Sequence, residues 1–133
     1  GRLVIRSGVL IVPIPKIVAF SQQAVEPVLD HPRIDRCLTG NPQRTTWEHF
    51  TNASGEFSCG IWACEVGAWR IEFSPDKDEF FCVIEGLVRL VDQAGEVVEI
   101  SEGEAAVIPA GFKGIFEVVR PVRKYFVVLD RKT

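Results

Sequence analysis

The chain has 133 residues, and 47% of them are hydrophobic, which is enough to build the buried core of one domain. Its net charge is −3, and the 15 basic and 18 acidic residues are mixed along the chain, so neither a nucleic-acid-binding stripe nor a disordered charged tail is expected. Four cysteines without a CxxC pair, with two histidines, argue against a zinc ribbon and favour a reduced, cytoplasmic protein.

Residues 1–45 are predicted to form an extended N-terminal arm that belongs to the same domain as the rest of the chain. They contain five of the eight prolines, and proline-rich segments run extended along a surface and rarely form helix interiors. The apolar stretch at residues 8–20 is interrupted by Pro13, Pro15 and Lys16, and it is too short to cross a bilayer. No membrane partner is therefore expected. The apolar arm is predicted to pack on its own barrel or on a second subunit.

Residues 46–133 are predicted to form short β-strands, because apolar runs alternate with Gly, Pro and Asp at regular intervals. The predicted strands cover residues 46–51, 57–66, 68–73, 79–85, 87–92, 97–101, 105–108, 115–119 and 124–130. No helical period of useful length appears in this part of the chain. The pattern predicts an all-β fold, either a sandwich or a barrel.

The period of two along a strand assigns side chains to faces. If Glu79 points into the barrel, its neighbours of the same parity do so as well. The predicted inward set is Trp69, Ile71 and Phe73 on one strand, Glu79, Phe81 and Val83 on the next, and Gly114, Phe116 and Val118 on a later one. This set predicts an aromatic and aliphatic lumen around one carboxylate.

The spacing of glycines and prolines provides a second pattern. The first half reads Gly67, five residues, Phe73-Ser74-Pro75, three residues, Glu79, six residues, Gly86; the second reads Gly103, five residues, Pro109-Ala110-Gly111, two residues, Gly114. This frame resembles the cupin superfamily, the RmlC-like group. The resemblance implies a single-domain double-stranded β-helix (jelly-roll) barrel, and it implies a homodimer, since such proteins usually pair and the arm has apolar surface to bury. The apolar side chains of the arm are Val9, Ile11, Ile14, Ile17 and Phe20.

Five further stretches are similar to the cupin subfamily found in ureidoglycine aminohydrolases and ethanolamine-utilisation proteins. They are Gly60-Ile61-Trp62, Gly67-Ala68-Trp69-Arg70, Asp78-Glu79-Phe80, Pro109-Ala110-Gly111-Phe112-Lys113-Gly114 and Val122-Arg123-Lys124-Tyr125. Each stretch is weak by itself, but their order and spacing are specific.

The histidines of the metal-binding cupins are missing from this frame. Positions 73, 75 and 114, which are His in those proteins, are Phe, Pro and Gly here. The alternative is a metal site rebuilt from Glu79, Cys82, His49 and either Asp76 or Asp78, but Cys82 has the opposite parity to Glu79 and is expected to face outward. No metal and no other cofactor are therefore expected.

Glu79 is the residue of the frame that is best able to carry chemistry. A carboxylate in an apolar lumen is a candidate acid or base, or an anchor for a ligand. The structural alternative is an ion pair with Arg70, Arg89 or Lys124. The candidate ligand-binding residues are Trp69, Phe73, Phe81, Phe116, Lys124 and Tyr125. With Trp62, the aromatic ones are candidates for a cage around a cationic amine, and ordinary barrel core is the competing interpretation. Lys124 and Tyr125 are neighbours, so only one of them can face inward.

Three functions are compatible with these residues. The first is a small-molecule-binding cupin without a metal, recognising an amine or ureido compound through Glu79. The second is an enzyme of nitrogen metabolism, of the aminohydrolase or isomerase type, that uses Glu79 as acid or base. The third is an accessory or structural subunit whose barrel is filled by side chains. One fold hosts many functions, so the resemblance does not choose among them.

Overall fold

The computed structural model describes residues 4–6, 8–11 and 13–132. Its strands are β1 (Val4–Arg6), β2 (Val9–Ile11), β3 (Val28–Asp30), β4 (Cys37–Thr39), β5 (Arg44–Thr51), β6 (Phe57–Cys64), β7 (Gly67–Glu72), β8 (Lys77–Asp92), β9 (Val97–Ser101), β10 (Ala105–Ile108) and β11 (Lys113–Asp130), and η1 (Phe20–Gln22) is a 3₁₀ turn. The prediction of an all-β fold is confirmed.

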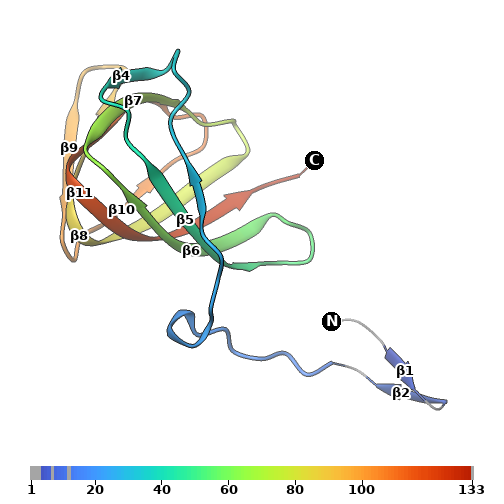
Figure 1. Cartoon of the computed structure of the whole chain (residues 1–133). Helices are drawn as coiled ribbons and strands as arrows, with labels where there is room; N and C mark the ends of the chain where they lie inside the picture. The colour runs from blue at the N-terminus through green and yellow to red at the C-terminus, as the bar shows by residue number, and fades with distance from the viewer. Residues whose placement is uncertain (1–3, 7, 12, 133) are drawn as a thin grey trace.

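The main sheet curls into a barrel around its two longest strands (Figure 1). Its path runs β10-β8-β11-β6-β5-β3, while β9 pairs with β8, and β7 pairs with both β11 and β4. The first part of β11 pairs with β7, and the later part pairs with β6, so one strand serves two partners on the same side. A long strand that changes its partner in this way belongs to both parts of the sheet, so a jelly roll can close without an additional segment that connects those parts.

The barrel bends where Gly86 of β8 meets Pro121 of β11. Gly86 has a φ of +97°, and a Cβ atom added to it would lie 2.2 Å from the Pro121 carbonyl oxygen. The register between the two strands also shifts three times between residues 118 and 124. From the sequence, strands were predicted to end at Gly86 and again near residues 120–123. This prediction is wrong, because β8 continues through Gly86 and β11 continues through residues 120–123. A glycine or a series of bulges bends a strand without ending it.

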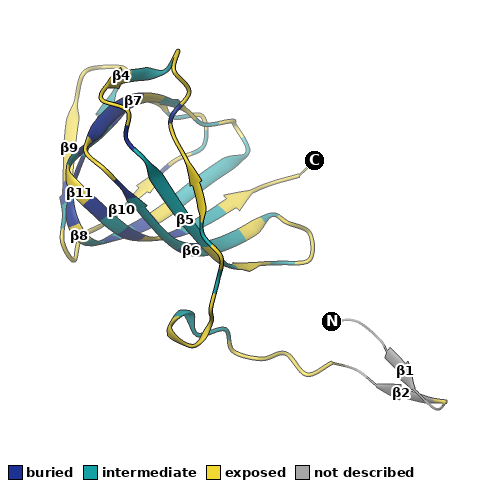
Figure 2. Cartoon of the chain, viewed as in Figure 1, coloured by how far each residue is buried: buried dark blue, intermediate teal, exposed yellow. Residues whose placement is uncertain are grey.

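The core lies between the inner faces of β7, β8 and β11, where Figure 2 shows most of the buried positions. Phe81, Val88 and Val118 are fully enclosed, and Trp69 and Phe116 are nearly so. The predicted inward parity of these strands is thereby confirmed. Each fully buried Val, Leu or Phe side chain stabilises the fold by about 1.5–3 kcal/mol.

The segment predicted as an arm has two different parts. Strands β3 and β4 pair with β5 and β7, so residues 28–39 join the barrel sheet. Residues 13–19 run extended and away from it (Figure 1). Phe20 fixes the junction, because its ring stacks on His49 of β5 with centroids 4.4 Å apart. The side chains of Val9 and Ile11 lie outside the described residues.

The extended part of the arm leads to a prediction about assembly. Ile14 and Ile17 are 81% and 95% exposed, and an exposed apolar arm is typically buried by a partner. We expect the full chain to run as a homodimer in multi-angle light scattering, and the double variant Ile14→Asp/Ile17→Asp to run as a monomer with an unchanged circular dichroism spectrum. Equal masses for the two proteins would contradict this role of the arm.

Candidate functional site

A cavity of about 320 Å³ opens at one end of the barrel. Strands β5, β6, β7, β8, β10 and β11 all contribute to its wall, so it forms only when the sheet has curled. Its charged lining residues are Arg44, Lys77, Glu79 and Lys124, and its aromatic ones include Trp62, Trp69, Phe73 and Phe116. An apolar chamber of this size with a few convergent polar groups is the usual form of a small-molecule site.

An ion pair between Glu79 and Lys124 lies in the wall of this cavity. The Lys124 ammonium donates to Glu79 Oε2 at 2.8 Å, and the two side chains are only 6% and 13% exposed, the lysine being the more buried. In the β8–β11 register, Lys124 lies opposite Val83, whereas Val128 lies opposite Glu79. The long stem of the lysine therefore runs along the inner face, past Phe81, to reach the carboxylate.

Aromatic rings surround the ammonium of Lys124. It lies 4.5 Å from the ring centroid of Trp62, 4.4 Å from that of Phe81 and 5.0 Å from that of Phe116. Such contacts contribute about 0.5–2 kcal/mol each, the more so when water is excluded. Three of the five rings predicted as a cage for a ligand amine, those of Trp62, Phe81 and Phe116, thus surround an amine of the chain itself.

The structure brings together most of the predicted ligand-binding residues. Trp69 and Phe116 pack in the wall with ring centroids 5.2 Å apart, and Phe73 also lines the cavity, with the Lys77 ammonium 4.4 Å from its ring centroid. Phe81 is fully buried behind Lys124 rather than in the lining.

Tyr125 does not join this group. It is 47% exposed and lies on the outer face of β11, with its ring 6.2 Å from that of Phe20. Lys124 takes the inward place, as the alternation of the strand requires of one of the two neighbours.

Arg44 and Lys77 also line the cavity, although neither is among the residues predicted from the sequence. Arg44 falls in the region assigned to the arm, and its guanidinium lies 5.5 Å from the centroid of Trp69. Lys77 was placed before the start of the Glu79 strand. A signal for it was present, because Lys77 has the same parity as Glu79, and β8 begins at Lys77.

The three positions that carry histidine in metal-binding cupins do not converge here. Phe73 lines the cavity, Pro75 is exposed in the turn before β8, and a Cβ atom at Gly114 would lie 2.1 Å from the Val91 carbonyl oxygen. Glu79, the remaining residue of the set, already accepts from an ammonium. The side chains present therefore do not fit the metal centre of that superfamily.

The alternative metal site, built from Glu79, Cys82, His49 and Asp76 or Asp78, does not form among the described residues either. His49 Nδ1 donates a hydrogen bond to Gln23 Oε1 on the arm side, 3.1 Å away. Asp78 accepts from the Ala110 amide and from Arg131, and these bonds hold the pKa of its carboxyl below the usual range. In the described part of the chain, no three His, Cys, Asp or Glu side chains gather as a metal would need.

Cys59 and Cys64 are poor candidates for an activated thiolate. Burial raises the pKa of Cys64 to about 12 and also raises the pKa of Cys59. A thiol with a raised pKa stays protonated at neutral pH and is a poor nucleophile.

Over the described residues, no helix has the length and apolar character to span a membrane.

Most of the barrel matches the model of one known protein family. Residues 51–126, more than half of the chain, match the family model described as EutQ-like cupin domain. The matched segment contains the Glu79–Lys124 pair and the aromatic rings around it, and it ends before the last part of β11. A comparison with curated proteins found no match.

Solved structures with a similar fold include two proteins named EutQ. EutQ of Clostridium difficile is 28% identical with a TM-score of 0.60, over 76% of this chain and 80% of that one. The putative ethanolamine utilization protein Q of Salmonella typhimurium is 16% identical with a TM-score of 0.60, over 83% and 100%. A protein of unknown function from Pseudomonas syringae pv. tomato is 20% identical with a TM-score of 0.70, and this chain covers 45% of its length while 80% of this chain is matched.

Proposed function

The chain belongs to the EutQ-like cupin domain family, and from this premise we propose that it binds a small molecule with a ureido or amide group in the barrel cavity, without a cupin-type metal centre. The observation that carries the proposal is the Glu79–Lys124 pair, which lines a cavity of about 320 Å³. The Lys124 ammonium occupies the position beside the Glu79 carboxylate that a bound cation would need.

A ureido or amide group matches the hydrogen-bonding groups of this pair. Glu79 is an acceptor, and Oε2 is the oxygen that Lys124 uses, so the carboxylate retains lone pairs for ligand N–H donors. The Lys124 ammonium has three N–H donors and can offer one to a ligand carbonyl. A planar group with N–H donors on one side and a carbonyl oxygen on the other satisfies both residues at once.

A ligand amine fits the same place less well. Lys124 already neutralises Glu79 and already fills the aromatic cage. A second ammonium about 4 Å from the first would be repelled by about 4 kcal/mol at the effective dielectric of a protein surface. Of the two ligand classes raised by the sequence, the ureido class is therefore the one we propose.

Benzylurea and benzylammonium provide a matched test of the proposal. We expect benzylurea to raise the melting temperature of the protein and to give heat in isothermal titration, because a ligand that binds only the folded state stabilises it. Benzylammonium is expected to do neither. Tighter binding of benzylammonium would overturn the ureido assignment, and no binding of either compound would favour a barrel filled by its own side chains.

Glu79→Gln tests whether the carboxylate is the anchor. We expect this variant to bind benzylurea about tenfold more weakly, since a charge-assisted hydrogen bond is roughly twice as strong as a neutral one. Glu85→Gln is the matched control, because Glu85 lies on the same strand and is exposed. Equal affinities of Glu79→Gln and Glu85→Gln for benzylurea, measured by titration calorimetry, would remove Glu79 from the site.

A further inference from the structure

A second pocket, of about 330 Å³, adjoins the cavity and shares five lining residues with it: Arg44, Trp69, Ile71, Phe73 and Lys77. We call it the rim pocket. Its charged lining residues are Arg33, Arg36, Arg44, Arg70, Lys77 and Glu72. Five basic groups and one acidic group gather here in a chain whose net charge is −3, so the charge of this pocket is opposite to that of the whole protein.

Three of these cations have no ion pair within the described residues. Arg44 binds Asp30 through two hydrogen bonds of 2.8 and 2.7 Å, and Arg33 binds Asp35 in the same bidentate way. Glu72 lies 3.5 Å from Lys113. Arg36, Arg70 and Lys77 remain, and the contact of Lys77 is with the face of Phe73.

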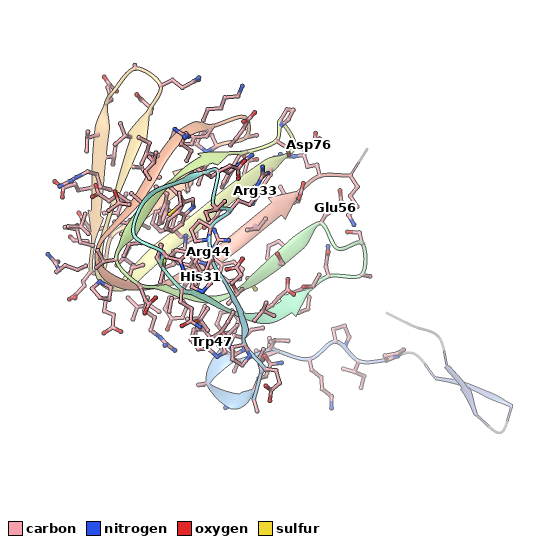
Figure 3. All side chains as sticks on the ribbon, turned by 45° about the horizontal axis from the view of Figure 1, so that its top comes forward. His31, Arg33, Arg44, Trp47, Glu56 and Asp76 are labelled. Carbon is pink, nitrogen blue, oxygen red and sulfur yellow. The ribbon has the colours of Figure 1, made fainter. Side chains whose placement is uncertain are left out.

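The fold brings these three cations together from separate segments. The turn at residues 33–36 runs beside β7, because the Arg70 amide donates to the Arg36 carbonyl at 2.9 Å and Cys37 pairs with Trp69. Lys77 begins β8 and lines both pockets. Arg33 and Arg44, which share the pocket with them, lie close together on one side of the barrel (Figure 3).

We propose that the rim pocket is an anion subsite that holds a carboxylate or phosphate group of the molecule bound in the cavity. This inference rests on the proposed function, because the two pockets share lining residues and one ligand would occupy both. Arginine offers planar, paired donors that match an oxyanion. Cations without an acidic partner keep this capacity, whereas an arginine already held by a carboxylate has lost part of it.

Half-amides of succinic, glutaric and adipic acid test the inference, with the corresponding diamides as neutral isosteres. The amide end addresses Glu79 and Lys124, and the three chain lengths bring the carboxylate to different distances from them. By titration calorimetry at low salt, we expect the best half-amide to bind about tenfold more tightly than its diamide, and this preference to shrink at 0.15 M salt, where the screening length is about 8 Å. Competition by inorganic phosphate would identify phosphate as the better anion, and its absence would identify carboxylate.

The double variant Arg36→Gln/Arg70→Gln tests whether the preference for the half-amide over the diamide arises in the rim pocket. This variant is expected to bind the half-amide and the diamide with equal affinity. That affinity should equal the affinity of the wild type for the diamide, and this equality would also show that the barrel of the variant is intact. Arg120→Gln is the control, because Arg120 is exposed and lies outside both pockets. A preference for the acid that survives in the double variant would overturn the subsite.

The failures of the two proposals are distinguishable. Diamide or benzylurea binding without any preference for the half-amide would overturn the anion subsite and leave the proposed function standing. No binding of benzylurea, diamides or half-amides would overturn the proposed function, and the subsite would fall with it.

Discussion

Replacing Lys124 with Met is expected to lower the free energy of unfolding by about 3–5 kcal/mol, the usual loss when one partner of a buried ion pair is removed. The variant leaves the Glu79 carboxylate, with a side chain only 13% exposed, among aromatic rings without its cation. Methionine keeps most of the volume of the lysine stem, so the loss reports the missing charge rather than a cavity. Urea unfolding with an unchanged m-value would measure it.

Two variants identify the source of this loss. Lys113→Met removes a lysine of the same strand from an exposed pair with Glu72, and it is expected to cost less than about 1 kcal/mol. The double variant Glu79→Leu/Lys124→Met is expected to recover most of the stability, because it leaves no unpaired charge. A double variant as unstable as Lys124→Met would show that packing, and not the unpaired carboxylate, causes the loss.

A chemical rescue connects this pair to ligand binding. Lys124→Ala removes the atoms of an n-propylammonium ion and empties the ring of aromatic side chains around them. We expect n-propylammonium to raise the melting temperature of Lys124→Ala and to leave that of the wild type unchanged. A similar shift in both proteins would mean that the ion binds elsewhere.

Gly114→Ala is expected to lower the free energy of unfolding by about 1–3 kcal/mol, and Gly114→His by more, because both force atoms into occupied space. A Cβ atom at this position would lie 2.1 Å from the Val91 carbonyl oxygen and 2.9 Å from the Phe112 ring. Gly114 and Ile115 pair with Asp92 and Val91 of β8, so relief of the clash has to disturb that ladder. Urea unfolding of Gly114→Ala gives the minimum cost.

The same geometry predicts that a metal site cannot be restored by substitution alone. We expect the triple variant Phe73→His/Pro75→His/Gly114→His to show no stoichiometric binding of Ni²⁺ or Zn²⁺ in titration calorimetry, since Pro75 is exposed and position 114 has no room. Phe73→His is the control, and it is expected to fold normally because Phe73 lines the cavity and is only partly buried. Tight binding of one metal ion by a folded triple variant would contradict this account.

Much of the candidate site was predictable from strand parity. Trp69, Phe73 and Phe116 line the cavity, as does Glu79, because side chains two apart on a strand share a face. The partner of Glu79 was not predictable in this way, since Arg70, Arg89 and Lys124 were all compatible. Arg89 instead pairs with Glu117 and Glu99. The register of β8 against β11, with its shifts near residues 118–124, makes Lys124 the partner.

The amino-acid sequence by itself determined the all-β fold, the positions of most strands and the membership of the cupin superfamily, which the family match confirms. These properties depend on local alternation and on glycines and prolines at fixed spacing. The tertiary structure decided that Lys124 fills the aromatic cage and that Arg36, Arg70 and Lys77 line one neighbouring pocket. Those contacts join residues far apart in the chain, and they depend on the bend at Gly86 and on the pairing of β4 with β7, which no local pattern encodes.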